Sequence, residues 1–315
     1  MIFNQRLQKM EYGFVLPKLI SNEKLLLFVK SVESLGFHSI WASDHVVLPI
    51  ERTNLYPYTD DGSFTASPED PQLDALILLS FLASHTEKIK IGTSVLIAPY
   101  RNPILQAKML ASLDVLTGGR VICGLGVGWW KEEFAALQAP FEDRGLATDE
   151  YIQIFKTLWQ DNEPEFSGET YQFSNIAFFP KPNGIPIWIG GHTKRAIRRT
   201  VKYGDAWHPT RLTPEKIKEM KLYLDEQCQI HERNTEEITI SLKRTLHFTD
   251  ISINTNSKLR SQSALIDSTN KIIEDIKKCA EVGIKQLTFD FQTNNLDECV
   301  NIMEHLANVD AKLDA

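Results

Sequence analysis

The chain has 315 residues, of which 43% are hydrophobic and 24% are charged, a composition typical of a folded globular protein. Its 41 acidic residues outnumber its 34 lysines and arginines, so the formal net charge is −7. This balance argues against a dedicated binder of nucleic acid or of anionic membranes, because both tasks need a basic surface. The sequence also lacks an apolar run near the ~18–20 residues of a membrane span, and we expect a cytoplasmic protein.

Short apolar runs alternate with longer segments of helical periodicity along the chain. We expect strands over residues 13–17, 38–45, 89–98, 120–129, 185–191, 205–210, 238–249 and 286–291. Between the first two, Leu25, Phe28 and Val32 recur at helical spacing, and Gly36 marks the end of that helix. Eight such units in a chain of this length favour a single domain over residues 1–315, an α/β fold closed as a (β/α)8 TIM barrel. An open doubly wound sheet is the alternative, but the G-x-G-x-x-G turn of dinucleotide-binding folds is absent after the first strand.

Two insertions interrupt this alternation. Residues 49–71, after the second strand, are polar and rich in Pro, Asp, Ser and Thr. Such a long loop on the catalytic face predicts a lid. Its aromatic residues are Tyr56, Tyr58 and Phe64. They suit packing over a ring-shaped ligand, although a surface loop that packs its own aromatics explains them equally well. Residues 162–184, before the fifth strand, contain a hairpin-like segment with Gly168 near its turn.

Four cysteines are scattered along the chain without a C-x-x-C pair: Cys123, Cys228, Cys279 and Cys299. We therefore expect reduced cysteines in the core rather than disulfides or a zinc cluster. The sequence contains no H-E-x-x-H motif and no other Cys/His ligand set, so no metal site is predicted. A G-x-S-x-G nucleophile elbow and a P-loop are also missing.

In a (β/α)8 barrel the active site lies where strands end and loops begin. The second strand ends in Asp44 and His45, an acid and an imidazole that can orient a substrate or move a proton; an ion-paired couple without chemistry is the alternative. The third ends in Thr93–Val95, whose hydroxyl residues can hydrogen-bond a heterocycle, although Ser and Thr are common everywhere. The fourth has glycines at alternate positions over residues 124–128, which leaves one face bare for a flat ligand or for a tight bend.

The strongest single feature is the segment 187–193, IWIGGHT, which leads directly into Lys194 and Arg195. A strand that turns through two glycines into a helix points amide N–H groups and the helix dipole at one spot. Thr193 is a suitable N-cap residue. We therefore predict a phosphate site here, with a solvated basic helix face as the alternative.

Two residues near later strand ends carry weaker signals. A lone histidine such as His208 is more often structural than catalytic. Lys243, in the seventh strand, is the lysine that an aldolase would use. A phosphate-binding aldolase or isomerase barrel therefore stays open as an alternative.

The sequence resembles the luciferase-like monooxygenase superfamily, which includes bacterial luciferase and many enzymes that use FMN or coenzyme F-420. The segments that carry the resemblance are GFHSIWASDHVVLP (36–49), IGTSVLIAPYRNPILQAK (91–108), LDVLTGGRVICGLGVGWWKEEF (113–134), PIWIGGHTKRA (186–196) and GDAWHP (204–209). Their order and spacing are those of the family. The last third of the chain is similar only in its alternation of strands and helices.

The resemblance implies an oxidoreductase that acts on a small organic substrate, with its cofactor across the strand ends. FMN and coenzyme F-420 are not distinguished, and a barrel that binds flavin without catalysis stays open as an alternative. FMN would imply a monooxygenase served by a separate flavin reductase, and coenzyme F-420 a dehydrogenase or reductase. Many relatives are dimers, which suggests a homodimer.

The resemblance also assigns site residues. It implies a cofactor phosphate at Gly190, Gly191 and His192, and Asp44 and His45 near the reactive ring. A non-proline cis bond between Ser94 and Val95, which many members keep, would lie beneath the ring with Thr93. The remaining implied cofactor contacts are Trp41, Gly126, Val127 and Gly128.

Overall fold

The computed structural model describes residues 10–19, 21–51, 55–59, 62, 64, 66–251, 264–291 and 293–313. Within these residues, eight parallel strands pair side by side and close into a barrel. They are, in their order around the barrel, β1 (Glu11–Val15), β2 (Ser39–Ala42), β3 (Lys90–Thr93), β5 (Val121–Gly126), β8 (Ile187–Gly190), β9 (Ala206–His208), β10 (Thr239–Phe248) and β12 (Gln286–Phe291). The predicted (β/α)8 TIM barrel and its eight strands are confirmed.

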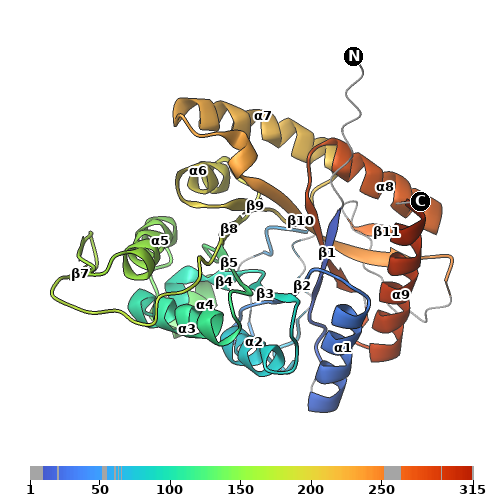
Figure 1. The fold of residues 1–315 in the computed structure, drawn as a ribbon, viewed down its shortest axis with the longest axis horizontal. Coiled ribbons are helices and arrows are strands. Elements are labelled where there is room, and N and C mark those ends of the chain that lie inside the picture. The colour runs from blue at the N-terminus through green and yellow to red at the C-terminus, as the bar shows by residue number, and fades with distance from the viewer. Residues whose placement is uncertain are drawn as a thin grey trace.

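Helices surround the barrel strands (Figure 1). They are α1 (Asn22–Ser34), α2 (Ala75–Ala83), α3 (Pro103–Leu116), α4 (Lys131–Ala136), α5 (Arg144–Gln160), α6 (Lys194–Tyr203), α7 (Pro214–Ile230), α8 (Thr269–Glu281) and α9 (Leu296–Leu313), with short 3-10 turns at Ala98–Tyr100 and Thr235–Glu237. Local sequence explains their bounds, as in α1. Its N-cap Ser21 accepts a hydrogen bond from the amide of Lys24, and Gly36 follows its end with φ of 76°. The described part of the chain has no helix that is both long and apolar enough to cross a membrane.

The main core fills the layer between strands and helices, and a second cluster lies inside the barrel. The inner cluster contains Val15, Trp41, Ile122, Trp188 and Ala206. The Trp41 ring fits there because two neighbouring strands carry glycine. A Cβ at Gly92 would lie 2.4 Å from the ring, and one at Gly13 would lie 2.5 Å from its Nε1. The glycines therefore fix where this indole sits beneath the strand ends.

Both predicted insertions are present. Residues 49–71 follow β2, although residues 52–54, 60, 61, 63 and 65 lie outside the described residues. The second insertion forms the antiparallel hairpin of β6 (Phe166–Ser167) and β7 (Gln172–Phe173), which projects away from the barrel (Figure 1). All four cysteines are free and buried, as expected.

The structure differs from the prediction in two strands. The run predicted over 89–98 divides into β3 and β4 (Leu96–Ile97), because the Ser94–Val95 peptide between them is cis and turns the chain. A short strand, β11 (Leu265–Asp267), pairs with the end of β10 outside the barrel and was not predicted. Three residues are too few to give a periodic signal.

Candidate cofactor and active site

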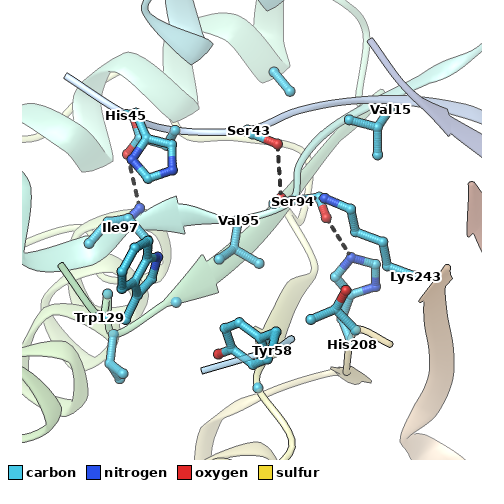
Figure 2. A pocket seen from close by; sticks show the side chains of 18 of the residues that line it. Val15, Ser43, His45, Tyr58, Ser94, Val95, Ile97, Trp129, His208 and Lys243 are labelled. Atoms are coloured by element: carbon cyan, nitrogen blue, oxygen red, sulfur yellow. Dashed lines mark hydrogen bonds between the residues drawn. The ribbon is translucent and has the colours of Figure 1, made fainter. Parts of the chain in front are cut away.

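A cavity of about 1410 Å³ opens where the barrel strands end. Its walls come from the last residues of several strands, such as Val15, Gly126, Gly190 and His208, and from the loops that follow them (Figure 2). This is the face on which barrel enzymes carry their active sites. Of the predicted site residues, nine line it: Asp44, His45, Ser94, Val95, Gly126, Val127, Gly128, Gly190 and Gly191.

Val95 lies in the cavity between two glycine backbones. The Ser94–Val95 peptide is cis, as the resemblance implied. A Cβ at Gly126 would come within 2.4 Å of the Val95 side chain, and one at Gly190 within 2.8 Å. Neither position has room for a side chain while Val95 stays in place. The result is a smooth patch of one valine and bare backbone in the cavity wall.

A buried histidine supports this patch from one side. Figure 2 shows His208 beside Ser94, with its Nε2 2.9 Å from the Ser94 hydroxyl oxygen. Its Nδ1 lies 2.9 Å from the hydroxyl oxygen of Ser241. Burial, together with the positive charge of Lys243, lowers the pKa of His208 to about 3, so the imidazole is neutral. It connects β9, β10 and the end of β3 through two hydroxyl groups.

Two residues predicted to contact the cofactor, Trp41 and Thr93, lie behind the cavity wall and do not form part of its surface. The indole of Trp41 is fully buried, stacks on the His208 ring at 5.2 Å between centroids, and donates to the Ser39 hydroxyl over 2.8 Å. The Thr93 hydroxyl donates to the carbonyl of Gly124 over 2.7 Å. Neither residue lines the cavity. Packing turns these two side chains into the barrel, and their direct contact with a cofactor stays a prediction.

Asp44 is held in an ion pair. Its carboxylate accepts from both terminal nitrogens of Arg101, over 2.7 and 2.8 Å, and from the amide of Ile97 over 2.9 Å. Arg101 also donates to Asp74 over 2.7 Å. Burial lowers the pKa of Arg101, but the hydrogen bonds and charges of Asp44 and Asp74 raise it overall. The geometry therefore favours the alternative interpretation of Asp44, an ion-paired anchor, here tying β2 to β4.

His45 is oriented by a buried carboxylate. Its Nδ1 lies 2.9 Å from Oε2 of Glu133, which also accepts from the Tyr100 hydroxyl over 2.8 Å. The other oxygen of Glu133 accepts from the amide of Val46 over 2.7 Å. Burial alone would raise the pKa of Glu133, but these hydrogen bonds outweigh it and hold the pKa below its usual value. An ionised Glu133 requires a proton on Nδ1 of His45, which leaves Nε2 available for proton exchange.

The predicted phosphate turn has the expected backbone. Gly191 has φ of 103°, and Thr193 caps α6 by accepting from the amide of Ala196 over 3.2 Å. The Trp207 indole donates to the carbonyl of Gly191 over 2.8 Å, which fixes the turn from below. Five cationic side chains of α6 line the adjacent cavity wall: Lys194, Arg195, Arg198, Arg199 and Lys202. The imidazole of His192, which does not line the cavity, packs edge-on against Tyr58 at 4.9 Å, and its buried Nδ1 has no hydrogen-bond partner among the described residues.

The described aromatics of the lid pack over the cavity. The Tyr56 ring lies 5.3 Å from that of Tyr58 and 5.1 Å from that of Trp129. The Phe64 ring lies 5.4 Å from those of Trp129 and Trp130. Burial raises the pKa of Tyr56 and of Tyr58, so both are neutral phenols. The lid therefore presents an aromatic, uncharged surface opposite the strand ends.

Sequence reasoning missed several residues of this site. Arg101 and Glu133 fall inside segments that carried the family resemblance, but nothing in their spacing pairs them with Asp44 and His45. Arg144, which donates to the carbonyl of Gly128 over 3.2 Å, and the wall residues Arg211 and Asp290 gave no signal at all. These contacts depend on how the barrel closes, which no local pattern reports.

Comparison with known proteins finds relatives that match part of the chain. An uncharacterized protein of Mycobacterium tuberculosis is 35% identical over 179 residues, or 56% of this chain, and the chain spans only 62% of that relative's length. The FMNH(2)-dependent dimethylsulfone monooxygenase of Pseudomonas putida is 31% identical over 167 residues, covering 51% of this chain and 46% of its own.

Solved structures share the fold at low sequence identity. An F420-dependent secondary alcohol dehydrogenase, in complex with an F420-acetone adduct, gives a TM-score of 0.77 at 15% identity over 96% of this chain and 99% of its own. The family profile described as luciferase-like monooxygenase matches residues 10–306. The chain therefore belongs to the luciferase-like monooxygenase family.

Proposed function

We propose that the protein is a two-electron oxidoreductase that binds FMN or coenzyme F-420 in the strand-end cavity and acts on a small organic substrate. The observation that carries the proposal is the patch around Val95, where Gly126 and Gly190 have no room for a Cβ. A flat ring can lie against this patch, because no side chain projects from either glycine. The patch continues into the turn at Gly191, which suits the phosphate of the same ligand.

The charges of the cavity fit either cofactor. The cationic side chains of α6 beside the Thr193 cap suit a phosphate, whether a terminal monoester or an internal diester. The curated relative from Pseudomonas putida is named for reduced FMN, and the solved alcohol dehydrogenase is named for F420. With FMN we propose a monooxygenase served by a separate flavin reductase, and with coenzyme F-420 a dehydrogenase or reductase. The cytoplasmic location and homodimer expected from the sequence stay part of the proposal.

The chain's own residues have distinct tasks in such a reaction. Bound coenzyme F-420 would supply hydride transfer, whereas bound reduced FMN would supply the electrons that activate oxygen. His45, oriented by Glu133, would accept or give a proton at Nε2. Asp44 would act as a positioning residue through Arg101, and the Tyr56, Tyr58 and Phe64 lid would exclude water.

A paired titration tests the proposal. The purified protein is titrated with FMN and with coenzyme F-420 at low salt, and cofactor fluorescence is followed. We expect micromolar binding of at least one cofactor, weakened about tenfold or more by Arg195→Glu, since this change reverses a charge beside the phosphate turn. Lys277→Glu, an exposed charge reversal on α8 away from the cavity, is the matched control. Binding of neither cofactor by the folded protein would sink the proposal and favour an aldolase or isomerase.

A further inference from the structure

The cavity contains a second cationic region apart from the phosphate turn. It lies at the ends of β9, β10 and β12, across the barrel mouth from α2 and α3, and its charged members are Arg211, Lys243 and Asp290. Two of these side chains are cations and one is an anion. The region is separate from the cations of α6, which lie beside the phosphate turn.

Lys243 extends along the cavity wall. Figure 2 shows its side chain reaching toward Ser94, whose carbonyl oxygen lies 3.4 Å from its Nζ, a long hydrogen bond. The neighbouring His208 is neutral and offers no charge. Burial lowers the pKa of Lys243, Asp290 raises it and Arg211 lowers it, so all three charges are close enough to interact. A lysine ammonium has three donors, and the long contact to Ser94 leaves donors for a ligand.

Arg211 and Asp290 are held beside it. The amide of Arg211 donates to the carbonyl of Lys243 over 2.8 Å, and Arg211 has φ of 56°, so the backbone turns sharply at this point. Its guanidinium carbon lies 6.0 Å from the centre of the Tyr56 ring. Asp290 faces Thr245 in the strand register, and within the described part of the chain its buried Oδ1 has no hydrogen-bond partner. Desolvated charges in a cavity wall cost free energy unless a ligand or partner compensates them.

We propose that this region binds the anionic group of the substrate, so that the substrate is an organic carboxylate with an apolar body. Lys243 and Arg211 receive the carboxylate, and the aromatic rings of Tyr56 and Trp129 contact the apolar part. Two basic side chains and one acidic side chain line this region, a balance that suits a monoanion. Asp290 accepts a hydrogen bond from a polar group of the same ligand. This inference rests on the proposed function, because it names the substrate class of the same cavity.

The test compares phenylacetate with phenylacetamide, two probes of equal shape that differ in charge. Their binding is measured by calorimetry at pH 6.5, both to the protein alone and to the protein saturated with whichever cofactor binds. We expect phenylacetate to bind at least about tenfold more tightly than phenylacetamide, because a hydrogen bond between two charged groups is stronger than one to a neutral amide.

Three variants test how phenylacetate binding depends on the charges of this region. Lys243→Met weakens phenylacetate binding about tenfold or more, since it keeps the length of the side chain and removes the charge. Asp290→Asn tightens it about threefold or more, because it removes a repulsive charge. Lys156→Met, at a half-buried lysine of α5 that does not line the cavity, leaves it unchanged. A misfolded variant cannot produce the tightening expected of Asp290→Asn.

The outcomes separate the two proposals. Equal binding of both probes, or no response to Lys243→Met and Asp290→Asn in a protein that binds its cofactor, overturns the carboxylate site and leaves the proposed function standing. Charge-dependent phenylacetate binding in a protein that binds neither cofactor overturns the proposed function and leaves the anion site standing.

Discussion

At the scale of single residues, buried ionisable side chains connect the segments that form the open end of the barrel. Asp44 and Glu133 have no exposed side-chain surface, and each accepts several hydrogen bonds. Burying such charged groups costs free energy. Removing one member of a buried pair destabilises the folded protein strongly, because its partner stays charged in a medium of low dielectric constant. The charged side chains around the cavity therefore contribute to stability as well as to binding.

Replacing Asp44 tests this role directly. We expect Asp44→Ala to lower the free energy of unfolding by about 3–5 kcal/mol, because it leaves Arg101 buried with only Asp74 as partner. Urea denaturation at pH 7 measures the change. The double variant Asp44→Leu with Arg101→Met should recover much of the loss, since it removes both charges. A loss below about 1 kcal/mol for the single variant would contradict the anchoring role.

His208 gives the structure a pH dependence of known sign. Its pKa is lowered from 6.5 to about 3 in the folded protein, chiefly by burial, so the unfolded chain binds a proton that the folded protein does not. Stability contributed by this group is complete above pH 6.5 and is lost as the pH falls, at about 1.4 kcal/mol per pH unit. Between pH 7 and pH 5 the loss from this residue is about 2 kcal/mol.

The matched variant is His208→Asn, which keeps hydrogen-bonding groups for Ser94 and Ser241 but does not titrate. We expect its unfolding free energy to fall less than that of the wild type between pH 7 and pH 5, by the same ~2 kcal/mol. Other histidines contribute equally to both proteins and cancel in the comparison. Parallel pH profiles for the two proteins would show that His208 is not held neutral.

At the scale of elements, glycines in neighbouring strands determine how the strand ends meet. A Cβ at Gly124, in β5, would lie 1.9 Å from the backbone carbonyl oxygen of Thr93, in β3. Backbone cannot move aside as a flexible side chain does. The position of the Ser94–Val95 segment therefore depends on a glycine in the adjacent strand.

Gly124→Ala should therefore destabilise the fold strongly, although it adds only one methyl group. We expect a loss of about 3 kcal/mol in the free energy of unfolding, at the upper end of the usual cost of overpacking. Gly145→Ala is the control, because its added methyl group would lie 3.4 Å from the flexible end of Arg199, and alanine favours helix α5. Thermal unfolding compares the two. Equal melting temperatures for them would contradict the close approach.

Local pattern predicted most elements and only part of the site. Apolar runs predict the barrel strands, because parallel strands buried on both faces are apolar on successive residues. Glycines mark where the intervening helices end. The sequence indicated the glycine turn at residues 190–191 and also Asp44 and His45, which all line the cavity, because strand ends are marked in the sequence. The partners of those residues were not, since Arg101 lies 57 residues from Asp44 and Glu133 lies 88 from His45. Such pairs form only when the barrel closes, and the inward turn of Trp41 is decided in the same way.

At the scale of the whole molecule, one cavity is built from residues spread over most of the chain, so a ligand there should stabilise the complete fold. We expect FMN or coenzyme F-420, at a free concentration 100 times its dissociation constant, to raise the free energy of unfolding by about 2.7 kcal/mol. Thermal unfolding at several cofactor concentrations measures this. A cofactor that binds without shifting the transition would indicate binding to the unfolded chain as well.

The most direct test of the central claim is a crystal structure of the protein with whichever of the two cofactors it binds. The account predicts the flat ring against Val95, between Gly126 and Gly190, with the phosphate at the amides of residues 190–193. A cofactor bound outside this cavity, or a phosphate held elsewhere than at this turn, would contradict it.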